Sequence, residues 1–169
     1  NITYEGEPSL YKEHHYILSM EDVLELVIEN REKRKFMAGE KFKYSNTGYV
    51  LLAYIVEKIS GQTFESFMDQ KIFIPLSMKN SSVWNLNTTI GKLEDRVQGT
   101  NNNKLNDFTW MDGIAGDGAV FICIEDFMKW DRSLANYTIV SDTTFQEAVT
   151  PFITSAGDTS YYGFGWSLS

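Results

Sequence analysis

The feature that most constrains the fold of this chain is an apolar run, Tyr49 to Val56, which is followed by Ile59 and then by Gly61. Asn46 or Thr47 can cap a helix that contains this run, and a glycine such as Gly61 commonly ends one. Apolar side chains surround its first two turns almost completely, which is typical of a helix enclosed by neighbours. We therefore expect the rest of the fold to enclose this helix.

Other helices are expected before and after it in the sequence. Ser19 and Asp22 resemble a capping box, and apolar residues then recur at helical spacing. The remaining predicted helices start at Thr63 and end before Pro75, run from about Ile124 to Leu134, and start at Ser141 and end before Pro151. Short strands are predicted at 96–99, 105–110 and 161–168. The sequence thus predicts a mainly α fold with a few short β-strands, in which residues 1–169 form a single unit.

Composition excludes several function classes. The 169 residues carry 15 Lys+Arg against 23 Asp+Glu, a formal net charge of −8, which argues against a nucleic-acid partner. No apolar run approaches the roughly 18–20 residues of a transmembrane segment, and no signal peptide is evident. With one cysteine, Cys123, and two adjacent histidines, His14 and His15, we expect no metal site and no cofactor.

Three short motifs could carry chemistry. Ser9-Leu-Tyr-Lys12 has the spacing at which a lysine can deprotonate a serine, but the residues after it are too polar for a central helix. The glycine-spaced segment Gly113–Gly118 lacks the lysine of a phosphate loop and reads as a tight turn. Tyr44-Ser45-Asn46 precedes the apolar helix, so Tyr44 could serve as a base and Asn46 as an amide ligand, or they could be a packing aromatic and a helix cap.

The wider sequence around these residues resembles the serine β-lactamase-related family of class C β-lactamases, penicillin-binding DD-peptidases and esterases. The resemblance rests on Gly39-Glu-Lys-Phe-Lys-Tyr44-Ser-Asn46-Thr-Gly-Tyr, on the helix ending Glu57-Lys-Ile-Ser-Gly61, and on Pro75-Leu-Ser-Met78. Downstream, Gly116-Asp-Gly118 and Tyr162-Gly-Phe-Gly-Trp166 resemble the glycine turn and a strand of the family's sheet. The resemblance implies the helical subdomain of the serine β-lactamase/transpeptidase-like α/β fold.

The same resemblance assigns roles to two residues. Tyr44 would be the tyrosine of the Tyr-x-Asn element, which assists proton transfer at the nucleophilic serine, and Asn46 would contact the amide of the substrate. Ser9 and Lys12 lie too close to Tyr44 to be the family's upstream Ser-x-x-Lys, and no Lys-Thr-Gly element follows Trp166. We therefore expect this chain to hold only part of a serine acyl-transferring hydrolase and to be inactive in isolation.

The implied substrate is a D-alanyl peptide, a β-lactam or an ester, and the sequence does not separate them. The alternative is a non-catalytic module of the same fold that senses cell-wall peptides or binds a protein partner. By resemblance we expect an extracytoplasmic location, and exposed sheet edges could support a homo-oligomer.

Overall fold

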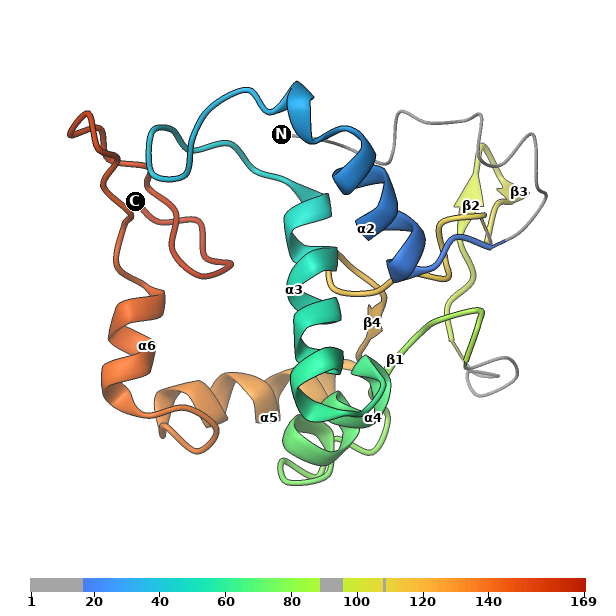
Figure 1. The fold of residues 1–169 in the computed structure, drawn as a ribbon. Coiled ribbons are helices and arrows are strands. Elements are labelled where there is room, and N and C mark those ends of the chain that lie inside the picture. Colours follow the sequence, from blue (N-terminus) through green and yellow to red (C-terminus); the bar gives the residue numbers. More distant parts are fainter. Residues whose placement is uncertain (1–16, 89–95, 108) are drawn as a thin grey trace.

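Helices dominate the computed structural model, which describes residues 17–88, 96–107 and 109–169 (Figure 1). The α-helices are α2 (Met20–Glu29), α3 (Asn46–Ser60), α4 (Phe64–Met68), α5 (Ile124–Ala135) and α6 (Asp142–Ala148), and two short helical turns are η2 (Arg31–Lys33) and the π-helical η3 (Asp69–Phe73). The strands are β1 (Ser82–Val83), β2 (Thr100–Asn101), β3 (Lys104–Leu105) and β4 (Val120–Phe121). This architecture confirms the predicted fold class, mainly α with a few short β-strands.

The strands form two small antiparallel pairs. In the first, Ser82 of β1 lies opposite Phe121 of β4, and in the second, Thr100 of β2 lies opposite Leu105 of β3. The second pair lies closer to the turn than the predicted strands at 96–99 and 105–110. Asn102 and Asn103 both have positive φ, 50° and 60°, and a two-residue turn of this kind pairs the residues directly beside it.

Helix α3 starts one residue earlier than the predicted caps allow. Ser45, in an extended conformation, is the N-cap, and its side chain accepts a hydrogen bond from the backbone N–H of Gly48. The expectation that Asn46 or Thr47 caps the helix is therefore wrong, because both already lie inside it. Gly61 ends the helix as predicted, in the left-handed conformation with φ of 69°.

Neighbouring elements leave part of α3 exposed. Helix α2 packs against it, and their shared core includes Val23, Val50, Ala53 and Ile114. On another side, Leu52 and Ile59 are 57% and 83% exposed. In the described residues, α2, α4, the glycine turn and the C-terminal reversal all contact α3 but leave this side open, so the expectation that neighbours enclose the helix is incorrect.

A second hydrophobic core joins η3, β1 and the glycine turn. Its buried members are Phe73, Met78, Val83 and Ala115. Beside it, the carboxylate of Asp126 in α5 accepts hydrogen bonds from the chain segment that leads into β1. The hydrogen bonds to Asp126 hold the end of this segment next to β1 against α5, and the burial of Phe73 and Met78 holds its other part in the core.

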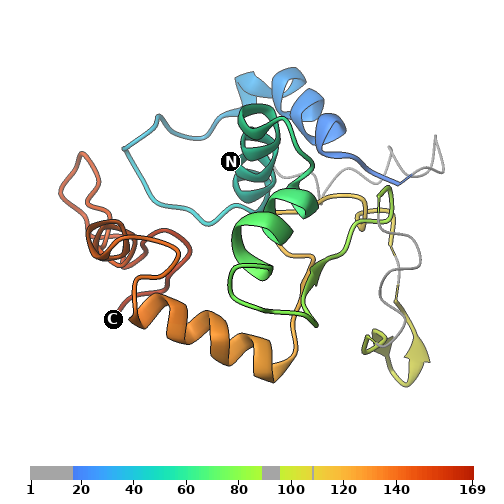
Figure 2. The same ribbon diagram turned by 90° about the horizontal axis from the view of Figure 1, so that it is seen from below.

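The C-terminal segment returns to the loop that precedes α3. Helix α5 leads away from α3 toward α6, and the chain then folds back toward residues 36–44 (Figures 1 and 2). The backbone N–H of Ser155 donates to the carbonyl of Gly39 at 2.8 Å. This contact joins segments more than a hundred residues apart in the sequence and brings the C-terminal segment close to Tyr44.

The predicted strand at 161–168 is instead a tight reversal. Its only strand-like pairing is an isolated bridge between Tyr162 and Ser167. The N–H of Gly163 donates to the carbonyl of Trp166 at 2.9 Å, and Gly165 has a positive φ of 83°, so the chain turns between them. The segment pairs with itself because no described strand lies beside it. Across the three described ranges, no helix is both long and apolar enough to cross a membrane.

Candidate active site

Tyr44 and Asn46 lie on the two sides of the helix cap. Ser45 is the N-cap of α3, so Tyr44 is the last residue of the incoming loop and Asn46 is the first residue of the helix. The N-terminus of a helix presents unpaired backbone N–H groups and a partial positive charge. A polar substrate group bound beside Asn46 would therefore meet a favourable electrostatic environment.

Aromatic side chains hold Tyr44 from two directions. Its ring centroid lies 5.7 Å from that of Tyr49 in α3 and 6.1 Å from that of Tyr162 in the C-terminal reversal. The hydroxyls of Tyr49 and Tyr162 hydrogen-bond at 2.6 Å, and Phe42 packs on Tyr162 with a centroid distance of 5.0 Å. We call Phe42, Tyr44, Tyr49 and Tyr162 the aromatic cluster. It leaves Tyr44 half exposed, at 51%, and thus accessible to a substrate.

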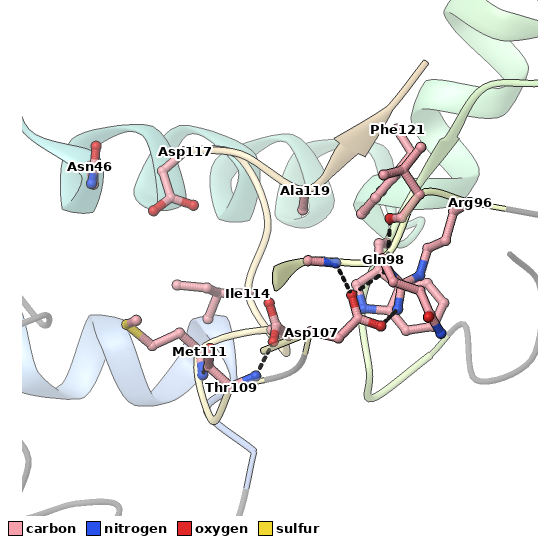
Figure 3. A pocket seen from close by; sticks show the side chains of 14 residues that line it. Asn46, Arg96, Gln98, Asp107, Thr109, Met111, Ile114, Asp117, Ala119 and Phe121 are labelled. Atoms are coloured by element: carbon pink, nitrogen blue, oxygen red, sulfur yellow. Dashed lines mark hydrogen bonds and ion pairs between the residues drawn. The ribbon is translucent and has the colours of Figure 1, made fainter. Parts of the chain in front are cut away.

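Asn46 also lines a cavity of about 540 Å³ (Figure 3). The cavity lies between the start of α3, the turn at Asp117 and residues 96–99. The other described lining residues include two aromatic side chains, Trp84 and Phe121, and Asp107, Thr109, Met111 and Asp112. This size lies within the range of ligand pockets, about 300–1,000 Å³. Tyr44 is not among the lining residues, so the structure places Asn46 in the cavity wall and Tyr44 outside it.

An ion pair forms the far wall of this cavity. The guanidinium of Arg96 binds both carboxylate oxygens of Asp107, with Nη1 at 2.6 Å from Oδ1, and the N–H of Gly99 donates to the same carboxylate at 2.8 Å. Hydrogen bonds from Arg96 and Gly99 lower the pKa of Asp107. Trp84 and Phe121 lie against the guanidinium, with ring centroids 5.1 and 5.5 Å from it. The positive charge of Arg96 and the negative charge of Asp107 in this wall thus neutralise each other.

Sequence reasoning did not identify this wall. Arg96 and Asp107 are 11 residues apart in a loop-rich region, and only the short β2–β3 hairpin brings them together. The spacing of two charged residues across an Asn-Asn turn was the available signal. It is weak, because many hairpins carry such pairs without any cavity beside them.

The turn at Gly116 explains the position of Asp117 at the other end of the cavity. Gly116 has a φ of 107°, and a Cβ there would lie 2.5 Å from the carbonyl oxygen of Tyr49 and 2.7 Å from the Cβ of Ala53. Only glycine allows the backbone to approach α3 this closely. The segment 113–118 is therefore a packing turn, and it places Asp117 near Asn46 (Figure 3).

Several other sequence candidates lie outside the described residues. Ser9, Lys12, His14 and His15 all fall in the range 1–16. In the part of the chain that the structure describes, no group of three or more His, Cys, Asp or Glu side chains could hold a metal ion.

Comparisons with known proteins identify the family. The family model described as Beta-lactamase matches residues 15–169. Penicillin-binding protein 4* of Bacillus subtilis (strain 168) is 30% identical over 167 residues, which cover 91% of this chain and 37% of that protein. A D-aminopeptidase of Gluconobacter oxydans (strain 621H) is 23% identical over 144 residues, covering 82% of this chain and 26% of that protein.

Solved structures show the same relationship. The crystal structure of penicillin binding protein from Bacillus halodurans superposes with a TM-score of 0.70 at 29% identity, covering 95% of this chain and 50% of that one. The chain spans only 26–37% of the length of the curated relatives named above. Because the family model matches nearly its whole length, this chain belongs to the beta-lactamase family, whose members include penicillin-binding proteins and D-aminopeptidases.

Proposed function

We propose that this chain provides the Tyr-x-Asn element of a serine acyl-transferring hydrolase that acts on D-amino acid amides, D-alanyl peptides or β-lactams. The observation that carries the proposal is the arrangement at the N-terminus of α3, where Asn46 lines the cavity and Tyr44 stands half exposed in the aromatic cluster. The names of a relative, D-aminopeptidase, and of the penicillin-binding proteins support this choice of substrates.

In this proposal the two residues divide the work. A serine hydroxyl attacks the substrate carbonyl, its proton passes to the leaving nitrogen, and the carbonyl carbon stays bound to the serine oxygen as an acyl-enzyme. The phenol of Tyr44 relays that proton, since its oxygen can both accept and donate a hydrogen bond. The side-chain amide of Asn46 binds the neighbouring amide of the substrate and fixes its orientation.

Labelling of the natural protein with a covalent probe tests the proposal. We expect a fluorescent penicillin or fluorophosphonate to label that protein. We expect Tyr44→Phe to slow acylation about 100-fold or more, because the relay hydroxyl is lost. Asn46→Ala should lower the second-order rate constant about 10-fold, because one substrate hydrogen bond is lost.

Tyr161→Phe is the matched control, since Tyr161 is 61% exposed and adjoins the aromatic cluster without belonging to it. We expect its acylation rate to match that of the unaltered protein. If the folded protein forms no adduct with either probe, the hydrolase proposal fails, and the alternative, a non-catalytic module that binds cell-wall peptides or a protein partner, takes its place.

Three further proposals accompany this function. We expect the 169-residue chain alone to give no turnover of a chromogenic β-lactam or ester. An extracytoplasmic location suits a protein that acts on cell-wall peptides. Short strands with open edges, such as β2, offer pairing surfaces for a homo-oligomer, which sedimentation analysis of the natural protein would reveal.

A further inference from the structure

Tyr44 ends a loop that contains turns but no helix or strand. Residues 34–45 form this loop between η2 and α3, and Tyr44 is its last residue before the N-cap Ser45. A functional side chain on a loop is placed less precisely than one on a helix or strand, unless neighbouring side chains lock its orientation. The contacts of the half-exposed Tyr44 ring therefore decide how precisely its phenol is placed.

The C-terminal reversal supplies one of these contacts. The ring of Tyr162 is nearly perpendicular to that of Tyr44, at 79°, with 6.1 Å between the centroids, which is the edge-to-face arrangement that aromatic pairs favour. Phe42, in the same loop as Tyr44, packs on Tyr162 with a centroid distance of 5.0 Å. Tyr162 thus packs on two side chains of the loop that carries the candidate relay phenol.

The hydroxyl of Tyr162 holds its own ring in place. Its oxygen lies 2.6 Å from the hydroxyl oxygen of Tyr49 in α3. Burial, followed by this hydrogen bond, raises the pKa of Tyr49, so Tyr49 stays protonated at neutral pH. Because the ring of Tyr49 also lies beside that of Tyr44, the two tyrosines support the Tyr44 ring together.

The backbone of the reversal is held at the end of α6. The carbonyl of Tyr162 accepts a hydrogen bond from the N–H of Phe152 at 3.2 Å, and the N–H of Phe164 donates to the carbonyl of Ala148 at 2.8 Å. A Cβ at Gly163 would overlap the same carbonyl, so only glycine allows the reversal to approach α6 this closely. The ring of Tyr162 therefore extends from a supported turn toward the loop before α3 (Figure 1).

We propose that Tyr162 is a positioning residue for Tyr44, whose ring keeps the phenol of Tyr44 in the orientation that proton relay requires and whose hydroxyl fixes that ring through Tyr49. The inference rests on the proposed function and deepens it, because it assigns a role in the reaction to a residue outside the Tyr-x-Asn element. Tyr162 acts through Tyr44 and does not touch the substrate.

Acylation of the natural protein by a fluorescent penicillin measures this role as a second-order rate constant. We expect Tyr162→Ala to lower the rate constant about 10- to 100-fold, because a misplaced relay group costs rate even when it is chemically intact. Tyr162→Phe keeps the ring and loses only the hydroxyl. We expect it to restore the rate constant to within about fivefold of that of the unaltered protein.

A double-mutant cycle with Tyr44→Phe separates positioning from a general loss of structure. Once the hydroxyl of Tyr44 is removed, no relay group remains for Tyr162 to position. Tyr162→Ala should therefore change the rate constant of the Tyr44→Phe protein by less than about twofold. A general loss of structure would slow acylation by the same factor whether or not Tyr44 carries its hydroxyl.

Tyr161→Ala is the matched control, because it removes the same side chain one residue away, at a position that is 61% exposed and outside the aromatic cluster. We expect its rate constant to equal that of the unaltered protein. Circular dichroism at the assay temperature verifies that each variant is folded. If Tyr162→Ala is unfolded, Tyr162→Leu, which leaves a smaller void, replaces it in the same cycle with the same expected result.

The failures of the two proposals are distinguishable. An unchanged rate constant in Tyr162→Ala, or losses that are additive with Tyr44→Phe, would overturn the role of Tyr162 while leaving the hydrolase intact. Absence of acylation in the unaltered protein would instead remove the hydrolase proposal and the positioning role with it.

Discussion

At the scale of single residues, Asp126 shows how one buried carboxylate organises two elements. Its side chain is 0% exposed, and it accepts hydrogen bonds from the backbone N–H of Asn80 at 2.7 Å and from the hydroxyl of Ser81 at 2.9 Å. The ammonium of Lys129 lies 2.6 Å from its other oxygen and also donates to the carbonyl of Ser77. A buried charge needs this many partners, because an unpaired one would be strongly destabilising.

These partners determine how stability depends on pH. Burial alone would raise the pKa of Asp126, but the hydrogen bonds from Lys129, Asn80 and Ser81 outweigh it, so the pKa is lowered. The folded state therefore holds the proton more weakly than the unfolded state. The resulting stability is present above the ordinary carboxyl pKa of about 3.9 and is lost as the pH falls through the lowered value.

We expect Asp126→Ala to lower the free energy of unfolding by about 2–3 kcal/mol at pH 7, because the donors lose a charged acceptor. Urea denaturation at several pH values measures this, and the difference from the unaltered chain should shrink below about pH 4. Asp131→Asn, an exposed aspartate on the same helix, should change stability by less than about 0.5 kcal/mol. A pH-independent difference for Asp126→Ala would contradict the ionic explanation.

Residue-level chemistry also shows where sequence prediction succeeds. Ser19, Thr63 and Ser141 were each identifiable as helix starts, since a hydroxyl that precedes a helical pattern has one clear use there. At α3, three consecutive residues, Ser45 to Thr47, are all competent caps, and only the backbone conformation decides among them. The same ambiguity explains why Asn46 had two interpretations. The cap interpretation is wrong because Ser45 is the N-cap, and the substrate-binding interpretation stays a prediction.

At the scale of elements, the packing of the glycine turn on α3 controls the shape of the cavity. We expect Gly116→Ala to destabilise the fold by about 1–3 kcal/mol, because its methyl group would overlap Tyr49 and Ala53 and its φ of 107° disfavours any side chain. Thermal unfolding measures the loss. The control is Gly118→Ala, where an added Cβ meets nothing within 4 Å. Equal losses for both variants would show that the turn does not depend on this close approach.

Element boundaries could be predicted accurately only where the contacts that set them are local in the sequence. Helices α5 and α6 match their predicted ranges closely, since periodicity and caps are encoded within a few residues. Strand prediction at 96–99, 105–110 and 161–168 was displaced or wrong, because a strand exists only with a partner and the partner lies elsewhere in the chain. For the same reason the Arg96–Asp107 wall could not be found before the hairpin was known.

At the scale of the whole molecule, the hydroxyl pair of Tyr49 and Tyr162 connects the C-terminal reversal to α3. The oxygens lie 2.6 Å apart although 113 residues separate them. Burial, followed by the hydrogen bond to Tyr162, raises the pKa of Tyr49. Tyr44 packs on the rings of both tyrosines. The hydrogen bond between Tyr49 and Tyr162 therefore holds the C-terminal segment against α3 and also positions the phenol of Tyr44, the candidate catalytic residue.

This connection predicts a specific loss of stability in alkali. A raised folded-state pKa means that the folded chain keeps its proton where the unfolded chain has lost it, so stability is full below the ordinary tyrosine pKa of about 10 and declines as the pH rises above it. We expect Tyr49→Phe to make this decline less steep and to cost about 1 kcal/mol at pH 7. In a double-mutant cycle, Tyr49→Phe and Tyr162→Phe should couple by about 0.5–1.5 kcal/mol. The exposed control Tyr161→Phe should leave the alkaline decline unchanged. Additive losses, or a decline as steep in Tyr49→Phe as in Tyr161→Phe, would show that another contact holds the C-terminal segment against α3.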